Sequence, residues 1–199
     1  MRVARQLLLL LVLTLPGLGA ARAQDLPAFY DVIGVALDDV LNIRTGPSAS
    51  SEIIGSLGPT ERAVEVVAFS GGGWAQVNTA ERSGWVSARF LVPARQWSWR
   101  SPETALTCFG TEPFWSLRID GDMAQLTSPD GTAPLMPILG RGASASRPAF
   151  LGLQFDGAVG FIRAEACSDG MSDRNYALSI GLVWFTGGRS LSGCCSLQR

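Results

Sequence analysis

The stretch Val40-Leu41-Asn42-Ile43-Arg44-Thr45-Gly46-Pro47-Ser48 decides the architecture expected for the first half of the chain. Apolar Leu41 and Ile43 alternate with Asn42 and Arg44, so one face of a strand would be apolar and the other polar. Gly and Pro then follow, and both residue types favour turns. The stretch therefore predicts a short β-strand with Leu41 and Ile43 in a core and the two polar side chains facing away from it.

The same pattern continues on both sides of this stretch. Between residues 30 and 92, short apolar runs are separated by Gly, Pro, Ser and Asn. No segment has the spacing of an amphipathic helix. The pattern predicts a small all-β barrel. Its expected strands include residues 32–35, 41–44, 53–57, 63–69, 74–77 and 84–86.

Five motifs carry a resemblance to a known family. They lie at residues 40–48, 54–57, 73–77, 84–86 and 90–91. In order and spacing, residues 28–93 resemble the bacterial SH3 (SH3b) domain family. Two departures are Phe90, where that family often has Tyr, and a turn at residues 58–60 without the usual basic residues. The resemblance implies an exported barrel that recognises peptides or peptidoglycan and is not itself catalytic.

Four residues of this region are candidates for ligand binding. Asn42 and Arg44 face away from the expected core, and Trp74 and Trp85 are aromatic residues within the motifs. Such rings either pack in the protein or line a ligand groove, and both interpretations stay open for the two tryptophans.

Residues 94–103 form a predicted linker between two domains. They contain Trp97 and Trp99, which share one face if the stretch is extended. With Arg95, the two rings would form an aromatic platform for a sugar or peptide. Packing between the two domains is the favoured interpretation, because large apolar patches are seldom left exposed.

The second half, residues 104–197, is again β-patterned. Asp-Gly and Gly-Gly pairs separate its apolar runs, which predicts an antiparallel meander or small barrel. The expected strands are residues 107–110, 114–119, 123–127, 135–139, 149–155, 159–166, 176–185 and 190–194.

Cys108, Cys167, Cys194 and Cys195 all fall in this half. An even number of cysteines in an exported chain predicts disulfides. A bridge between the adjacent Cys194 and Cys195 would distort the peptide bond, so we expect Cys108 and Cys167 each to bond to one of that pair. The connectivity stays open. A zinc site is disfavoured because no Cys-x-x-Cys pair is present.

Three further motifs, at residues 108–115, 167–174 and 193–195, resemble an uncharacterised family of exported bacterial β domains. This resemblance implies a shared fold and no particular reaction. If the disulfides form as expected, they bring four polar residues toward one place: Glu112, Asp169, Asp173 and Arg174. A calcium site and a carboxylate-pair hydrolase are the functional alternatives for this polar locus. The favoured interpretation is structural, with the aspartates capping turns and Arg174 pairing with one of them.

Composition restricts the possible chemistry. All 16 basic side chains are Arg, because the sequence contains neither Lys nor His. Ser-His-Asp and Cys-His catalysis, Schiff-base lysines and His-ligated metals are therefore excluded. We expect no cofactor, no metal and no catalysis.

Residues 1–23 read as a secretory signal, with a basic start, an apolar run at residues 7–15 and Ala21-Arg22-Ala23 before the cleavage point. A retained anchor is the alternative. Cleavage would leave 13 Arg against 17 acidic residues, a net charge of −4. This mild acidity argues against nucleic acid and anionic membranes as partners.

The sequence thus predicts a periplasmic or secreted protein of two β domains that binds peptidoglycan or an envelope protein or peptide. It carries no indication of oligomeric state. The alternative is a periplasmic inhibitor or assembly partner of another protein, resembling lysozyme inhibitors. It would act through the second domain, with residues 141–147 as a protruding loop.

Overall fold

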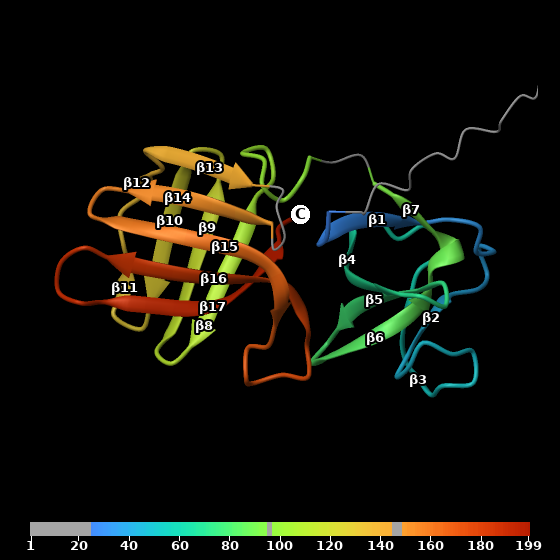
Figure 1. Ribbon diagram of the computed structural model, residues 1–199. Coiled ribbons are helices and arrows are strands. Elements are labelled where there is room, and N and C mark those ends of the chain that lie inside the picture. The colour runs from blue at the N-terminus through green and yellow to red at the C-terminus, as the bar shows by residue number, and fades with distance from the viewer. Residues whose placement is uncertain (1–24, 95–96, 145–148) are drawn as a thin grey trace, which may run out of the picture.

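The computed structural model describes residues 25–94, 97–144 and 149–199, so the predicted signal segment lies outside the described residues. The described chain forms two antiparallel sheets that lie side by side (Figure 1). Its helical structure is limited to one 3-10 turn, Ala88–Phe90. The all-β prediction is confirmed. Within these described ranges, no helix has the length and apolarity needed to cross a membrane.

The N-terminal sheet has seven strands in the order β3-β2-β6-β5-β4-β1-β7. Leu41 and Ile43 are buried while Asn42 and Arg44 are only half-buried, as their alternation predicts. The strands are β1 (Ala28–Val32), β2 (Leu41–Arg44), β3 (Ile53–Leu57), β4 (Val64–Ser70), β5 (Trp74–Thr79), β6 (Arg82–Ser87) and β7 (Leu91–Pro93).

The C-terminal sheet has ten strands in the order β11-β10-β9-β8-β17-β16-β15-β14-β13, with β12 paired to β10. The last strand, β17, lies between β16 and β8, so the end of the chain joins the two halves of this sheet. The strands are β8 (Leu106–Thr111), β9 (Phe114–Asp120), β10 (Met123–Ser128), β11 (Gly131–Thr132), β12 (Met136–Pro137), β13 (Gly140–Ser144), β14 (Phe150–Phe155), β15 (Ala158–Cys167), β16 (Tyr176–Trp184) and β17 (Ser190–Leu197).

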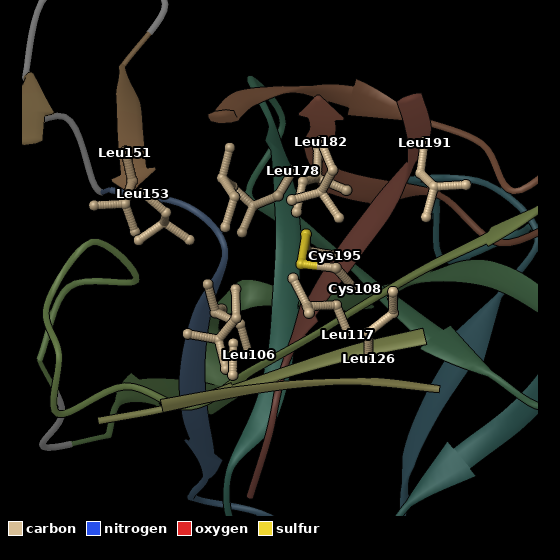
Figure 2. Packing of buried hydrophobic residues seen from close by; sticks show 14 of the residues in the cluster. Leu106, Cys108, Leu117, Leu126, Leu151, Leu153, Leu178, Leu182, Leu191 and Cys195 are labelled. Carbon is tan, nitrogen blue, oxygen red and sulfur yellow. A yellow bond between two sulfur atoms is a disulfide. The ribbon is translucent and has the colours of Figure 1, made fainter. Parts of the chain in front are cut away.

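Inward-facing leucines from opposite parts of the C-terminal sheet pack around the Cys108–Cys195 disulfide (Figure 2). The second disulfide joins Cys167 to Cys194. Each half of the Cys194-Cys195 pair is therefore bonded to a distant cysteine, and the predicted pairing with Cys108 and Cys167 is confirmed. The structure supplies the connectivity that the spacing left open.

The predicted aromatic platform of Trp97 and Trp99 is wrong. Residues 98–104 turn back on themselves, with backbone hydrogen bonds from Ser101 to Ser98 and from Thr104 to Ser101, so the stretch is not extended. Trp99 is 1% exposed and packs in the core of the C-terminal sheet, whereas Trp97 is 63% exposed. Arg95 lies outside the described residues.

The protruding loop expected at residues 141–147 is also corrected. Gly140–Ser144 form strand β13, which pairs along its length with β14, and residues 145–148 lie outside the described residues. The glycines and serines of this segment suggested a loop. Backbone pairing with β14 does not depend on apolar side chains, and this is why the strand was missed.

Backbone and side-chain contacts join the two sheets at several places. The loop between β15 and β16 reaches the turn between β5 and β6 (Figure 1), where Ser83 N–H donates to the Asp173 carbonyl at 3.0 Å and Asp173 N–H donates to the Glu81 carbonyl at 2.8 Å. At another contact, Leu197 N–H donates to a carboxylate oxygen of Glu65 on β4 at 2.9 Å. The chain end and one long loop thus fix the units against each other.

Candidate functional site

A groove of about 640 Å³ lies on the N-terminal sheet, within the range of roughly 300–1,000 Å³ typical of ligand sites. We call it the Trp74 groove. It is formed by β2, the start of β5, the end of β6 with the following 3-10 turn, and the segment between β1 and β2. Its lining residues are Gly34, Val35, Ala36, Asp39, Val40, Leu41, Asn42, Arg44, Ala49, Trp74, Ser87, Arg89 and Phe90.

Along β5 and β6, side chains alternate between the core and the groove, and this alternation determines which residues line the groove. On β5, Ala75 and Val77 are fully buried in the core. Trp74 directly precedes Ala75, so its side chain faces away from the core and is half-buried. On β6, Val86 is buried and Ser87 points outward, directly across from Trp74 in the strand pairing. The period of two thus carries Trp74 and Ser87 to the same face as Asn42.

Three of the predicted ligand-binding residues, Asn42, Arg44 and Trp74, therefore meet in one groove. Arg44 is held by a hydrogen bond from its guanidinium Nη1 to the Ser51 carbonyl oxygen at 2.7 Å. Trp85 lies opposite Arg44 across β2 and β6 but does not line the groove. Its half-buried ring belongs to the neighbouring part of the same face.

Sequence reasoning missed one wall of the groove. Arg89 and Phe90 follow β6, and the Arg89 guanidinium carbon lies 4.5 Å from the centre of the Phe90 ring. Phe90 is tied to the start of the 33–40 segment, because Ile33 N–H donates to the Phe90 carbonyl at 2.9 Å. The signal for Phe90 was its place in a motif. Arg89 had no signal of its own in the sequence.

The groove combines an indole face with two guanidinium groups, those of Arg44 and Arg89. Asp39 is the one acidic side chain among the lining residues, and its carboxylate accepts the Val40 N–H at 2.7 Å. Arginine forks bind carboxylates with two parallel hydrogen bonds, and an indole ring packs against apolar groups. The arrangement suits a ligand that carries a carboxylate beside an apolar segment.

The four polar residues predicted to lie together in the C-terminal sheet have different surroundings. Some stabilise turns or contacts between the sheets, and some line a second groove. Asp169 caps its own turn: Oδ1 accepts the N–H groups of Met171 at 3.0 Å and Ser172 at 2.9 Å. Burial acts to raise the pKa of Asp169, but the hydrogen bonds from Ser172 and Met171 outweigh it and lower the pKa. The predicted turn-capping role is present for this aspartate.

Of the other members of the locus, Glu112 lines a groove together with Asp169, while Asp173 and Arg174 make hydrogen bonds to the N-terminal sheet. Asp173 uses its backbone to join the β5–β6 turn, as described above. The predicted ion pair of Arg174 with an aspartate is wrong, because Arg174 Nε donates instead to the Ala80 carbonyl of the N-terminal sheet. The turn carries Arg174 across to the other unit. Glu112 lies with Asp169 in the lining of a second groove.

Among residues 25–94, 97–144 and 149–199, no cluster of three or more His, Cys, Asp or Glu side chains could hold a metal ion. The carboxylate oxygens of Asp169 accept hydrogen bonds from its own turn and from Tyr176.

Residues 39–92 match the family model of the bacterial SH3 domain. This span contains the whole lining of the Trp74 groove except residues 34–36. No curated protein and no solved structure matches the chain. The resemblance of the second half to a family of exported β domains stays a prediction.

Proposed function

Because residues 39–92 form a bacterial SH3 domain, we propose that the chain is a cell-envelope binding protein that holds peptidoglycan stem peptides in the Trp74 groove. Bacterial SH3 domains have a general cell-wall role. The single observation that supports the finer assignment is the meeting of Asn42, Arg44 and Trp74 with Arg89 in one groove. Stem peptides carry carboxylates beside methyl groups, which matches this lining.

The proposal includes the compartment. Two disulfides and a bacterial SH3 domain fit an extracytoplasmic protein. A periplasmic or secreted location follows if residues 1–23 act as the signal that their composition predicts. In that location the protein would meet the wall directly and would bind it without a reaction of its own.

Co-sedimentation with purified peptidoglycan sacculi tests the proposal. Wild type is expected in the pellet, and Trp74→Ala is expected to lose about tenfold or more in affinity, because an aromatic anchor contributes a large share of binding energy. Trp97→Ala is the matched control, since Trp97 is exposed but lies outside the groove. If Trp74→Ala sediments as wild type does, the groove is not the binding site.

The alternative of an inhibitor or assembly partner acting through the second domain stays a prediction. This alternative depends on a protruding loop at residues 141–147 that would contact the other protein. Residues 140–144 form strand β13 instead. Addition of the full chain to a lysozyme assay checks it, with a reduced lytic rate expected if the alternative holds.

A further inference from the structure

A second groove, of about 580 Å³, lies on the C-terminal sheet and is not used by the function proposed above. It covers the outward-facing side of β15, β16, β17 and β8, and we call it the Phe161 groove. Members of the three distinctive motifs of the second half converge on it, although Phe109 and Gly193 lie 84 positions apart in the sequence. The contributing motif residues are Phe109, Gly110, Thr111, Glu112, Cys167, Ser168, Asp169 and Gly193.

The floor of the Phe161 groove is lowered by a glycine. Gly181 on β16 pairs with Phe161 on one side and with Ser192 on the other. A Cβ placed on Gly181 would meet no atom within 4 Å, so the space above it is open. A side chain at this position would stand between Phe161 and Ser192, and its absence is what leaves the trough.

The walls offer an exposed ring and polar groups of several kinds. Phe161 is 45% exposed, and Phe109 packs edge-on against Tyr176 at 5.0 Å between ring centres. Arg163 lies two residues beyond Phe161 on the same exposed face of β15. The other polar side chains of the lining are Thr111, Glu112, Glu165, Ser168, Asp169, Ser179 and Ser192.

This chemistry favours a sugar over a peptide strand. The floor consists of interior strands whose backbone groups already pair with both neighbours, so it cannot take up an extended peptide by adding a strand. Recognition must come from side chains. A guanidinium fork, a carboxylate and hydroxyls bind neighbouring sugar hydroxyls, and an exposed ring packs against the apolar face of a pyranose.

We propose that the Phe161 groove binds an oligosaccharide, lying over Gly181 between Phe161 and Ser192, with Arg163 and Glu112 as the polar contacts. This site is separate from the Trp74 groove and does not depend on the function proposed for it. If both sites act, the protein holds a glycan chain on one unit and a peptide on the other, and the fixed contact between the units sets their separation.

Titration of the full chain with the β-1,4-linked pentamer of N-acetylglucosamine, followed by amide chemical shifts, tests the proposal. Saturable shifts are expected at residues of the Phe161 groove. Gly181→Leu fills the trough and is expected to weaken binding about tenfold or more. Gly142→Leu on β13 is the matched control, because its Cβ position is also open and lies outside the groove. Trp74→Ala is expected to bind the pentamer as wild type does.

Phe161→Ala and Arg163→Gln provide variants that do not depend on how the fold accepts leucine at position 181, since both side chains are exposed. Each is expected to weaken binding while the thermal unfolding midpoint stays near that of wild type. Absence of saturable binding, or unchanged binding by Gly181→Leu and Phe161→Ala, overturns the proposal. Shifts at this groove caused by a stem tetrapeptide and not by the pentamer would assign it to a peptide instead and would also overturn it.

Discussion

The carboxylate of Glu65 on β4 accepts the backbone N–H of Leu197 on β17 at 2.9 Å, so an acid in the N-terminal sheet anchors the last strand of the C-terminal sheet. Burial raises the pKa of Glu65 to about 7, although the Leu197 N–H and the charge of Arg199 both act to lower it. A charged carboxylate at this contact costs free energy that the neighbouring groups only partly recover.

The raised pKa predicts a pH-dependent stability. Between the ordinary value of 4.5 and about 7, the folded protein keeps a proton on Glu65 that the unfolded chain releases, so the free energy of unfolding falls as pH rises. Glu65→Gln keeps the hydrogen-bond acceptor and removes the titration. We expect it to be more stable than wild type at pH 8 by on the order of 1–3 kcal/mol and equally stable at pH 4. Urea unfolding at both pH values measures this, and a variant less stable than wild type at pH 8 would contradict it.

Gly84 on β6 leaves room for the neighbouring strand. A Cβ at this position would lie 2.4 Å from Cγ2 of Ile43 and 2.9 Å from Cδ1 of Ile54. Gly84→Ala is expected to lower the free energy of unfolding by about 1–3 kcal/mol, because the two isoleucines must move. Gly72→Ala, whose nearest neighbour would be 3.8 Å away, serves as the control in thermal unfolding. Equal effects of the two alanines would rule out this explanation.

The two disulfides close loops of different length. Cys108 and Cys195 are 87 positions apart in the sequence, and Cys167 and Cys194 are 27 apart. Loop entropy predicts that replacing the first pair by alanines lowers stability by about 4.5 kcal/mol and the second by about 3.5 kcal/mol. Denaturant unfolding of the two double variants tests the order. A larger loss from the Cys167–Cys194 pair would show that this bridge does more than close a loop.

Asp169 organises the turn that reaches the other sheet. Asp169→Ala removes the acceptor for the Met171 and Ser172 amides, so those amides are expected to exchange with solvent at least about tenfold faster. The pKa of Asp169 is lowered, so wild type should lose this protection as pH falls through the folded-state value, which lies below the ordinary 3.8. Asp156→Ala, in an exposed hairpin turn, is the control. Unchanged exchange in Asp169→Ala would show that the turn needs no cap.

Local alternation and turn residues were enough to predict strands β2 to β6 of the N-terminal sheet, because these strands are short and turn residues separate them. The strand expected at residues 32–35 is wrong, since the first strand is Ala28–Val32. The short strand Leu91–Pro93 was not predicted. Leu41 and Ile43 were correctly assigned to the core, and Asn42 and Arg44 to the opposite face. The cysteine arrangement also followed from covalent geometry, which excluded a bridge within the Cys194-Cys195 pair.

Features that depend on contacts between distant segments could not be predicted from the sequence. Arg89 completes the Trp74 groove only because the 3-10 turn after β6 folds against the segment before β2. Trp97 and Trp99 have the same residue type and nearly the same position, yet a turn exposes one and buries the other. Arg174 was assigned an aspartate partner, but the β15–β16 loop carries it to a carbonyl of the other unit. Each outcome depends on contacts between distant segments, which local patterns do not encode.

The most direct test of the account is an amide chemical-shift titration of the full chain with a soluble peptidoglycan stem peptide. The account predicts saturable shifts clustered at Asn42, Arg44, Trp74 and Arg89, with loss of saturation in Trp74→Ala. Absence of shifts at any attainable concentration, or shifts clustered away from the Trp74 groove, would contradict it.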